Sequence, residues 1–301
     1  MRRKKTAGMR GGTYMNEGRK TTLEMAADVC LPVALYYVVS NIALYLLNLA
    51  VQFIAERFFA GGLTWVLDNA SAIQVADNAV AMCIGFYVVR RQFLAETAAG
   101  GEPVLVAPRR VAAGWLREGM KQRKNDWHRF ILPLISGAGA ALALNFAAGL
   151  LDAASHDAVY DQVAGTQYAV PVWLGLIAYG IVSPIVEEGI FRGILYRKCR
   201  RCLGSAFPAA LISALLFGFL HGNVVQGVYG FLMGLMLAWL YERYDSFLVP
   251  VLVHTASNVS VFLLSLAGVF ASTKSAVTGC CICAFLSIFS MMFIIKSKIT
   301  K

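Results

Sequence analysis

Long apolar runs, separated by short polar segments, follow one another along most of the chain. Eight of them have the roughly 17 to 25 residues that a helix needs to cross the hydrocarbon core of a bilayer. They cover about residues 31–55, 73–89, 130–151, 171–196, 206–222, 225–241, 247–270 and 276–295. The pattern therefore predicts an all-α, polytopic membrane protein with about eight transmembrane helices around a core bundle that holds the active site.

The second run is the weakest of the eight. Asp68, Asp77 and Asn78 lie at or before its start, where polar side chains are costly inside a membrane. Seven spans is therefore the alternative count. Residues 61–72 are interpreted as a short element at the membrane interface.

The composition agrees with a membrane protein. Of the 301 residues, 58% are hydrophobic and only 15% are charged, whereas soluble domains carry about 25% charged residues. The net charge of +10 does not indicate nucleic acid as a partner, because the basic residues flank apolar runs instead of gathering on one folded face. The lipid bilayer is the expected surrounding of this chain.

The positions of Lys and Arg predict how the chain is oriented. With eight spans, all the main basic clusters fall on one side: residues 2–20, 90–129, 197–201, Arg243 and 296–301. The connection 152–170 holds three Asp and no Lys or Arg, and it falls on the other side. By the positive-inside rule, both termini are predicted to be cytoplasmic in a multi-pass protein of the cell membrane. The short basic loops favour a bacterial protein.

The chain is predicted to hold one membrane domain. Residues 1–28 form a basic cytoplasmic tail, 29–295 the helical domain with a motif-bearing core at 171–270, and 296–301 a second basic tail. No internal repeat of the kind found in many transporters is visible. In the connection 90–129, aromatic and basic residues are interspersed, which predicts an amphipathic helix on the membrane surface.

A few polar residues interrupt the later spans. Each ionisable group inside a span costs about 2.5 to 3.5 kcal/mol by insertion scales, so such residues indicate function. The fourth, fifth and seventh runs carry them: Glu187, Glu188, Arg192, His221, His254 and Asn258. Two carboxylates, a guanidinium and two imidazoles form a candidate catalytic set.

Helix geometry separates the two adjacent carboxylates. Glu188 lies four residues before Arg192, about 40° away around an α-helix, which favours an ion pair. Glu187 points about 140° away from Arg192 and is left without a partner in its own helix. Glu188 and Arg192 are therefore expected to form a structural pair, whereas Glu187 is the candidate acid or base.

The histidines extend the set across other helices. His254 and Asn258 are four residues apart and face one side, and Phe217 and His221 repeat this spacing. Two kinds of centre remain open. Glu187 is a base for water beside imidazole and amide donors for an oxyanion, or Glu187, His221 and His254 bind one zinc ion with an open fourth position.

Four motifs, in this order on separate apolar runs, carry a resemblance to a known family: Glu187-Glu188-x-x-x-Arg192, Phe217-x-x-x-His221, Phe231-x-x-Gly234 and His254-x-x-x-Asn258. Together, over about residues 171–262, they resemble the CAAX protease and bacteriocin-processing (CPBP, or Abi) family of intramembrane proteases. That family includes the type II CAAX prenyl endopeptidases. The resemblance covers only this third of the chain.

The resemblance implies an endopeptidase whose substrate is a membrane-embedded, hydrophobic or lipidated peptide, cleaved from the cytoplasmic side. It implies that Glu187 and His221 activate water and that His254 and Asn258 stabilise the oxyanion. Glu188, Arg192 and Phe217 then have supporting roles. Descriptions of the family differ on a metal, so the expected cofactor is either none or one zinc ion.

Two other functions fit parts of the pattern. A transporter would use Glu187 and the histidines as a proton relay, and a non-catalytic immunity protein would bind a peptide in the same cavity.

The expected depth of the site residues in the membrane is uneven. At 1.5 Å per residue, Glu187 and His254 lie about 10 to 14 Å from the cytoplasmic ends, whereas His221 lies at about 22 Å. The fifth helix is therefore expected to begin outside the bilayer or to tilt strongly.

Overall fold

The computed structural model describes residues 22–99, 128–271 and 273–297. Every regular element in these ranges is a helix. The amphipathic helix predicted in the connection 90–129 falls almost wholly outside the described residues. The α-helices are α1 (Thr22–Phe58), α2 (Gly62–Asp68), α3 (Ala70–Ala99), α5 (His128–Leu150), α6 (Ala153–His156), α7 (Ala158–Tyr168), α8 (Val172–Ile177), α9 (Ser183–Glu188), α10 (Arg197–Leu203), α11 (Ala206–Phe219), α12 (Val224–Tyr244), α13 (Leu248–Leu266) and α14 (Thr273–Lys296). Two π-helices, η1 (Ala178–Val182) and η2 (Gly189–Tyr196), and a 3₁₀ turn, η3 (Val269–Ala271), complete the set.

The prediction of a polytopic helical membrane protein is confirmed. Seven helical stretches in the described part are long and apolar enough to cross a membrane. The predicted fifth span, 206–222, is shorter than expected, because α11 has 14 residues and ends at Phe219. Its length is about 21 Å, less than the hydrocarbon core of a typical bilayer. The first helix starts earlier than expected, at Thr22, inside the segment assigned to the basic tail.

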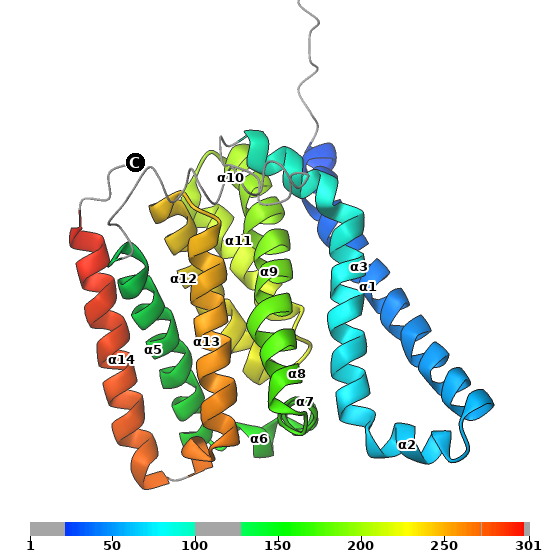
Figure 1. Cartoon of the computed structure of the whole chain (residues 1–301). Coiled ribbons are helices and arrows are strands. Elements are labelled where there is room, and N and C mark those ends of the chain that lie inside the picture. Colours follow the sequence, from blue (N-terminus) through cyan, green and yellow to red (C-terminus); the bar gives the residue numbers. More distant parts are fainter. Residues whose placement is uncertain (1–21, 100–127, 272, 298–301) are drawn as a thin grey trace, which may run out of the picture.

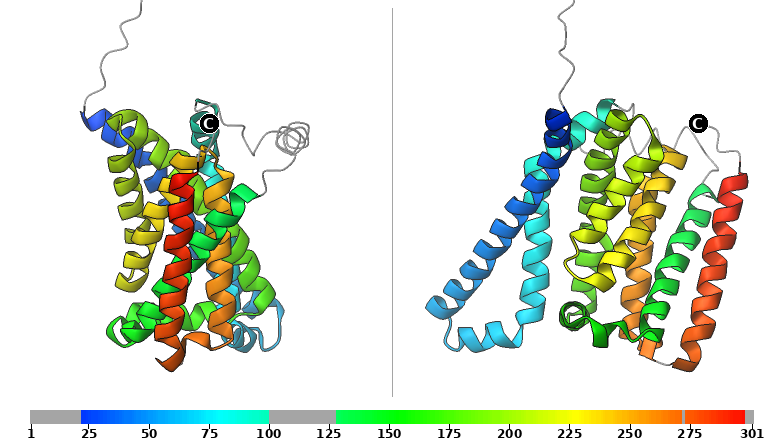
Figure 2. Two further views of the ribbon diagram at one scale, coloured as in Figure 1. Left: turned by 90° about the vertical axis from the view of Figure 1, so that its left-hand side faces the viewer. Right: turned by 180° about the vertical axis from the view of Figure 1, so that it is seen from behind.

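The helices form a bundle with α1 and α3 at one edge and α5 and α14 at the opposite edge (Figure 2). The start of α1 and the end of α14 lie at the same end of this bundle, and α6 and α7 lie at the other end (Figure 1). The short helix α2 corresponds to the element expected at 61–72. This arrangement defines two ends of the molecule, named here the terminal end and the α7 end.

The fourth span is one continuous helical stretch built from α8, η1, α9, η2 and α10. Its η2 part lies at the centre of the core, where Ile190, Ile194 and Leu195 are fully buried. Glycine allows α3 to pack closely against it. A Cβ atom added to Gly193 would lie 2.4 Å from the ring of Phe93, which is too close for any larger residue.

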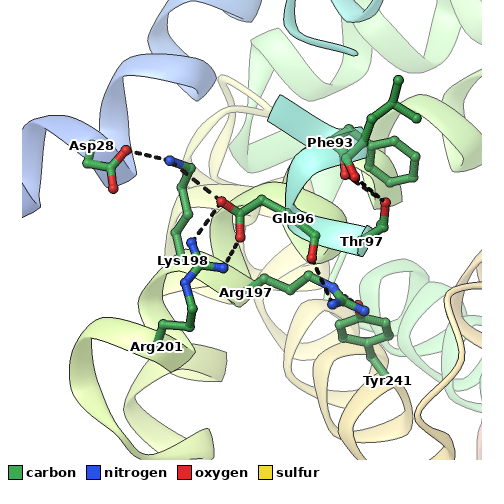
Figure 3. A network of polar contacts seen from close by, with 9 residues as sticks. Asp28, Phe93, Glu96, Thr97, Arg197, Lys198, Arg201 and Tyr241 are labelled. Carbon is green, nitrogen blue, oxygen red and sulfur yellow. Dashed lines mark hydrogen bonds and ion pairs between the residues drawn. The ribbon is translucent and has the colours of Figure 1, made fainter. Parts of the chain in front are cut away.

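Charged side chains at the terminal end join three helices (Figure 3). Lys198 of α10 lies 2.6 Å from Asp28 of α1 and 3.8 Å from Glu96 of α3. Arg201 donates hydrogen bonds to both carboxylate oxygens of Glu96, and the bond from Nη2 to Oε1 is 2.8 Å long. We name Asp28, Glu96, Lys198 and Arg201 the terminal charge network. It fastens the α1 and α3 pair to the rest of the bundle.

Candidate active site

A cavity of about 830 Å³ lies within the bundle. Its wall includes α7 and the parts of α5, α12 and α13 that lie nearest to it. The predicted site residues lie along this one cavity: Glu187, Phe217, His221, His254 and Asn258. The cavity therefore brings together side chains from the fourth, fifth and seventh predicted spans.

The predicted ion pair between Glu188 and Arg192 is confirmed. Arg192 Nη1 lies 2.9 Å from Glu188 Oε1, and both side chains are completely buried. Arg192 Nη2 also donates to the backbone carbonyl of Gly234, at 2.9 Å. The motif Phe231-x-x-Gly234 thus supplies an acceptor for the buried guanidinium. At Gly234 an added Cβ would lie 3.1 Å from Ala214, so glycine also allows α11 and α12 to pack closely.

His254 lies between the two adjacent carboxylates. Its Nδ1 is 2.8 Å from Glu188 Oε1, and its Nε2 is 3.8 Å from Glu187 Oε2. Because a carboxylate only accepts hydrogen bonds, Nδ1 carries a proton. Glu188 is therefore more than the partner of Arg192, since the same oxygen holds the imidazole of His254. Sequence spacing did not reveal this contact, which joins α9 to α13.

Glu187 is the more accessible carboxylate. Its side chain is 19% exposed, whereas that of Glu188 is completely buried. The hydroxyl of Ser183, one helical turn earlier, donates a hydrogen bond to Glu187 Oε1. Ser183 was not among the predicted site residues, although its position four residues before Glu187 is a signal that could have indicated it.

His221 does not lie on a helix, contrary to the prediction. Helix α11 ends at Phe219, and His221 occupies the turn before α12, where the following Gly222 has a φ of +75°. His221 Nδ1 is 2.7 Å from the backbone carbonyl of Phe217. A carbonyl only accepts, so Nδ1 carries the proton and Nε2 has a free lone pair. The cavity extends to this turn and so reaches His221, although that residue lies beyond the far end of α11.

Asn258 and His254, which lie four residues apart on α13, contact different protein groups. The side-chain amide of Asn258 donates to the backbone carbonyl of Tyr179, at 3.0 Å. An amide nitrogen has two N–H groups, so the second remains available to a ligand in the cavity. Tyr179 lies in the π-helix η1, and its role as acceptor has no signal in the sequence.

Phe217 packs against three of the site's polar groups. Its ring lies edge-to-face with His221, at a centroid distance of 4.9 Å, and with His254, at 5.8 Å. The guanidinium carbon of Arg192 is 4.8 Å from the same ring centroid, which adds a cation–π contact. Phe217 therefore limits how far both imidazoles can move.

Two π-helical segments flank the turn that carries the carboxylates. Helix α9, which ends with Glu187 and Glu188, lies between η1 and η2. A π-turn adds a residue to the helical repeat and is frequent at functional sites. The segments provide Tyr179 on one side and Arg192 on the other.

The residues expected to bind zinc do not fit a three-ligand site. In the described part of the chain, no three His, Cys, Asp or Glu side chains come together as metal ligands. Glu187 and His254 approach each other, but His221 does not join them in such a group. We therefore assign no step of the chemistry to a metal.

The comparisons with known proteins cover the part of the chain that holds these residues. The matching family model is described as "Type II CAAX prenyl endopeptidase Rce1-like" and spans residues 169–260. The matched residues are named here the Rce1-like segment, after the family model that they resemble. The resemblance seen in the four motifs is thus confirmed over the Rce1-like segment, which contains every predicted site residue. Helices α1, α3, α5, α7 and α14 lie outside it.

One relative is a curated protein of Bacillus subtilis (strain 168), named "Putative membrane peptidase YdiL". It is 37% identical over 102 residues, which are 33% of this chain and 39% of the relative. The match thus spans about two fifths of the relative's length. No solved structure matches the chain significantly.

Proposed function

We propose that this protein is an intramembrane endopeptidase that hydrolyses a peptide bond in a membrane-associated or lipidated peptide. The observation that carries the proposal is the cavity, whose wall includes Glu187, His221 and His254 inside a bundle of membrane-spanning helices. The Rce1-like segment and the similarity to a protein named as a membrane peptidase support the same reaction class.

Glu187 and His221 are the groups that activate water in this proposal. A water molecule in the cavity donates hydrogen bonds to Glu187 and to the free Nε2 of His221, and its oxygen attacks the peptide carbonyl carbon. Glu187 takes the proton that is lost and delivers it to the leaving nitrogen as the C–N bond breaks. The products are a carboxylic acid and an amine, which exchange the second proton of the water to give a carboxylate and an ammonium group.

His254 and Asn258 stabilise the oxyanion of the tetrahedral intermediate. Asn258 has one N–H beyond its bond to Tyr179, and a protonated His254 offers Nε2–H. Hydrogen bonds to an oxyanion are strong where water is excluded.

The wall of the cavity indicates an uncharged substrate segment. Among the residues that line it, the Asp, Glu, His, Lys and Arg side chains are Glu187, His221 and His254. The other polar side chains there are neutral amides, hydroxyls and phenols, including Gln74, Gln162 and Gln167. Amides can hydrogen-bond a peptide main chain, and the intervening apolar residues suit hydrophobic side chains.

The proposed orientation keeps both termini in the cytoplasm. The start of α1 and the end of α14 share one end of the bundle, as this orientation requires (Figure 1). The α7 end then lies on the opposite side, together with the cavity-lining residues that α7 provides. Labelling of a cysteine introduced at Gln167, but not of one at Ser297, by a membrane-impermeant reagent added outside intact cells is the expected result. The reverse pattern contradicts the orientation.

A cleavage assay tests the function. The protein is reconstituted in lipid vesicles with a fraction of membrane proteins and peptides, and new termini are identified by mass spectrometry. Glu187→Gln should lower their formation by about 100-fold or more, because the amide cannot accept the proton of water. Glu56→Gln, an exposed carboxylate near the end of α1, is the matched control and should retain full activity. Equal cleavage by the Glu187→Gln variant, or cleavage by none of the proteins, rejects the proposal.

A further inference from the structure

Asp157, outside the Rce1-like segment, binds two helices at once. It lies at the N-cap of α7, where its Oδ1 accepts a hydrogen bond from the backbone N–H of Tyr160, at 3.0 Å. Its Oδ2 accepts from the backbone N–H groups of Val224, at 2.9 Å, and Val225, at 3.2 Å. These two groups belong to the first turn of α12. A single carboxylate therefore satisfies free N–H groups at the starts of two helices.

The α12 side of this contact leads directly to His221. The turn that carries His221 ends at Asn223, whose side chain caps α12 by accepting from the N–H of Gln226, at 2.8 Å. Val224 and Val225, the partners of Asp157, follow immediately. Gly222 has a φ of +75°, which is unfavourable for residues with a side chain, so glycine lets the backbone turn at this point. The position of His221 thus depends on what holds the start of α12.

The α7 side of the contact leads to the substrate cavity. Gln162, Thr166 and Gln167 of α7 line the cavity, as do Val224 and Val225 themselves. The backbone N–H groups around Asp157, first that of Tyr160, lower the pKa of its carboxyl below the ordinary value. The charged form, which binds both helices, is therefore favoured at neutral pH.

We propose that Asp157 is a positioning residue, which fastens the α7 wall of the cavity to the turn that carries His221 and so sets the imidazole for water activation. This inference rests on the proposed endopeptidase function. Asparagine cannot replace it, because an amide has one acceptor oxygen and the two helices need both. Without the carboxylate, α7 and the start of α12 are no longer joined, and the side chain of His221 keeps only its hydrogen bond and ring contact with Phe217 among the described residues.

The test compares Asp157→Asn with Asp161→Asn in reconstituted vesicles. Asp161 is an acidic residue in the first turn of the same helix, and its side chain forms no hydrogen bond among the described residues. The kcat of Asp157→Asn should fall by about tenfold or more with a smaller change in KM, because small misplacement of a catalytic group is costly. Hydrogen exchange should become faster at residues 221–226 and stay unchanged in α14. Asp161→Asn should match the parent in both measurements.

Three results separate the alternatives. Unchanged kcat in Asp157→Asn, with an active parent, overturns the positioning role and leaves the endopeptidase proposal intact. A loss of active protein, with unchanged kcat for each remaining folded molecule, assigns Asp157 to stability alone and also overturns the role. Absence of cleavage by the parent protein rejects the proposed function and this inference with it.

Discussion

The two ends of the bundle use ionisable side chains in opposite ways. At the terminal end, Glu96 lies between Lys198 and Arg201, and Lys198 also reaches Asp28 (Figure 3). In the cavity, Glu187 has a neutral hydroxyl donor, Ser183, and an imidazole at 3.8 Å. The first arrangement neutralises each charge and joins helices. The second leaves a carboxylate with capacity for a further proton or ligand.

The same contrast recurs between two adjacent residues. Glu188 is completely buried, and one of its oxygens accepts from both Arg192 and His254, whereas Glu187 is partly exposed to the cavity. Identical side chains at consecutive positions thus differ in how fully their charge is matched. The degree of charge pairing, and not the presence of an acidic residue in a span, therefore distinguishes a carboxylate that joins helices from a reactive one.

The largest effect is expected at Glu188, because this carboxylate both neutralises Arg192 and orients His254. Glu188→Gln leaves the guanidinium of Arg192 without its buried counter-charge, so stability should fall by about 3 to 5 kcal/mol. Activity should fall as well, because His254 loses the acceptor that orients it. Thermal unfolding in detergent and the cleavage assay measure the two losses separately.

Glu187→Gln is the matched comparison for Glu188→Gln. It should abolish cleavage while leaving the unfolding temperature nearly unchanged, because no Lys or Arg in the described part of the chain lies within hydrogen-bond distance of Glu187. If both variants lose activity and neither loses stability, the division between a fastening and a reactive carboxylate is wrong.

A smaller effect is expected in the terminal charge network, and only on stability. Glu96→Gln removes the negative charge and one of the two acceptor oxygens of a buried side chain that Lys198 and Arg201 share, which should cost about 1 to 3 kcal/mol. The kcat should not change, because the network lies at the end of the bundle away from α7. Arg200→Gln is the control, since its pair with Glu242 is more than one third exposed on both sides and should contribute about 0 to 1 kcal/mol. A fall in kcat for Glu96→Gln would show that the two ends are coupled.

The smallest effect is expected from removal of metal ions. We propose that cleavage continues after exhaustive chelation, because His221 does not join Glu187 and His254 as a ligand group among the described residues. A bound zinc ion would give Glu187 a positively charged partner, as Glu96 has at the terminal end. Loss of activity on chelation, with recovery at one equivalent of zinc, would therefore contradict the proposed difference between the two carboxylates.

Much of the architecture follows from local patterns in the sequence. Apolar runs of sufficient length predicted the spans, because only a helix satisfies its own backbone within lipid. The four-residue spacing predicted the pair between Glu188 and Arg192, which forms even though η2 begins immediately after Glu188. The motifs identified Glu187, Phe217, His221, His254 and Asn258 as site residues, and these side chains line the cavity.

Other features of the site depend on contacts between distant segments. Glu188 reaches His254 across 66 residues, and Arg192 reaches a backbone carbonyl at Gly234, and neither contact has a periodic signal. The turn at His221 was missed because the apolar run 206–222 continues past the end of α11. The π-helices depart from the ideal repeat of 3.6 residues, so sequence periodicity could not predict them.

The short helix α11 has a consequence for the lipid around the protein. Phe207, Leu215 and Phe219 on this helix are exposed, so acyl chains cover a surface only about 21 Å long, against about 30 Å for an average hydrocarbon core. The bilayer must become thinner beside α11 or leave polar groups near His221 in hydrocarbon. Thinning brings the headgroup region and its water closer to the turn. Lipids with shorter acyl chains should therefore favour the hydration of this side of the cavity.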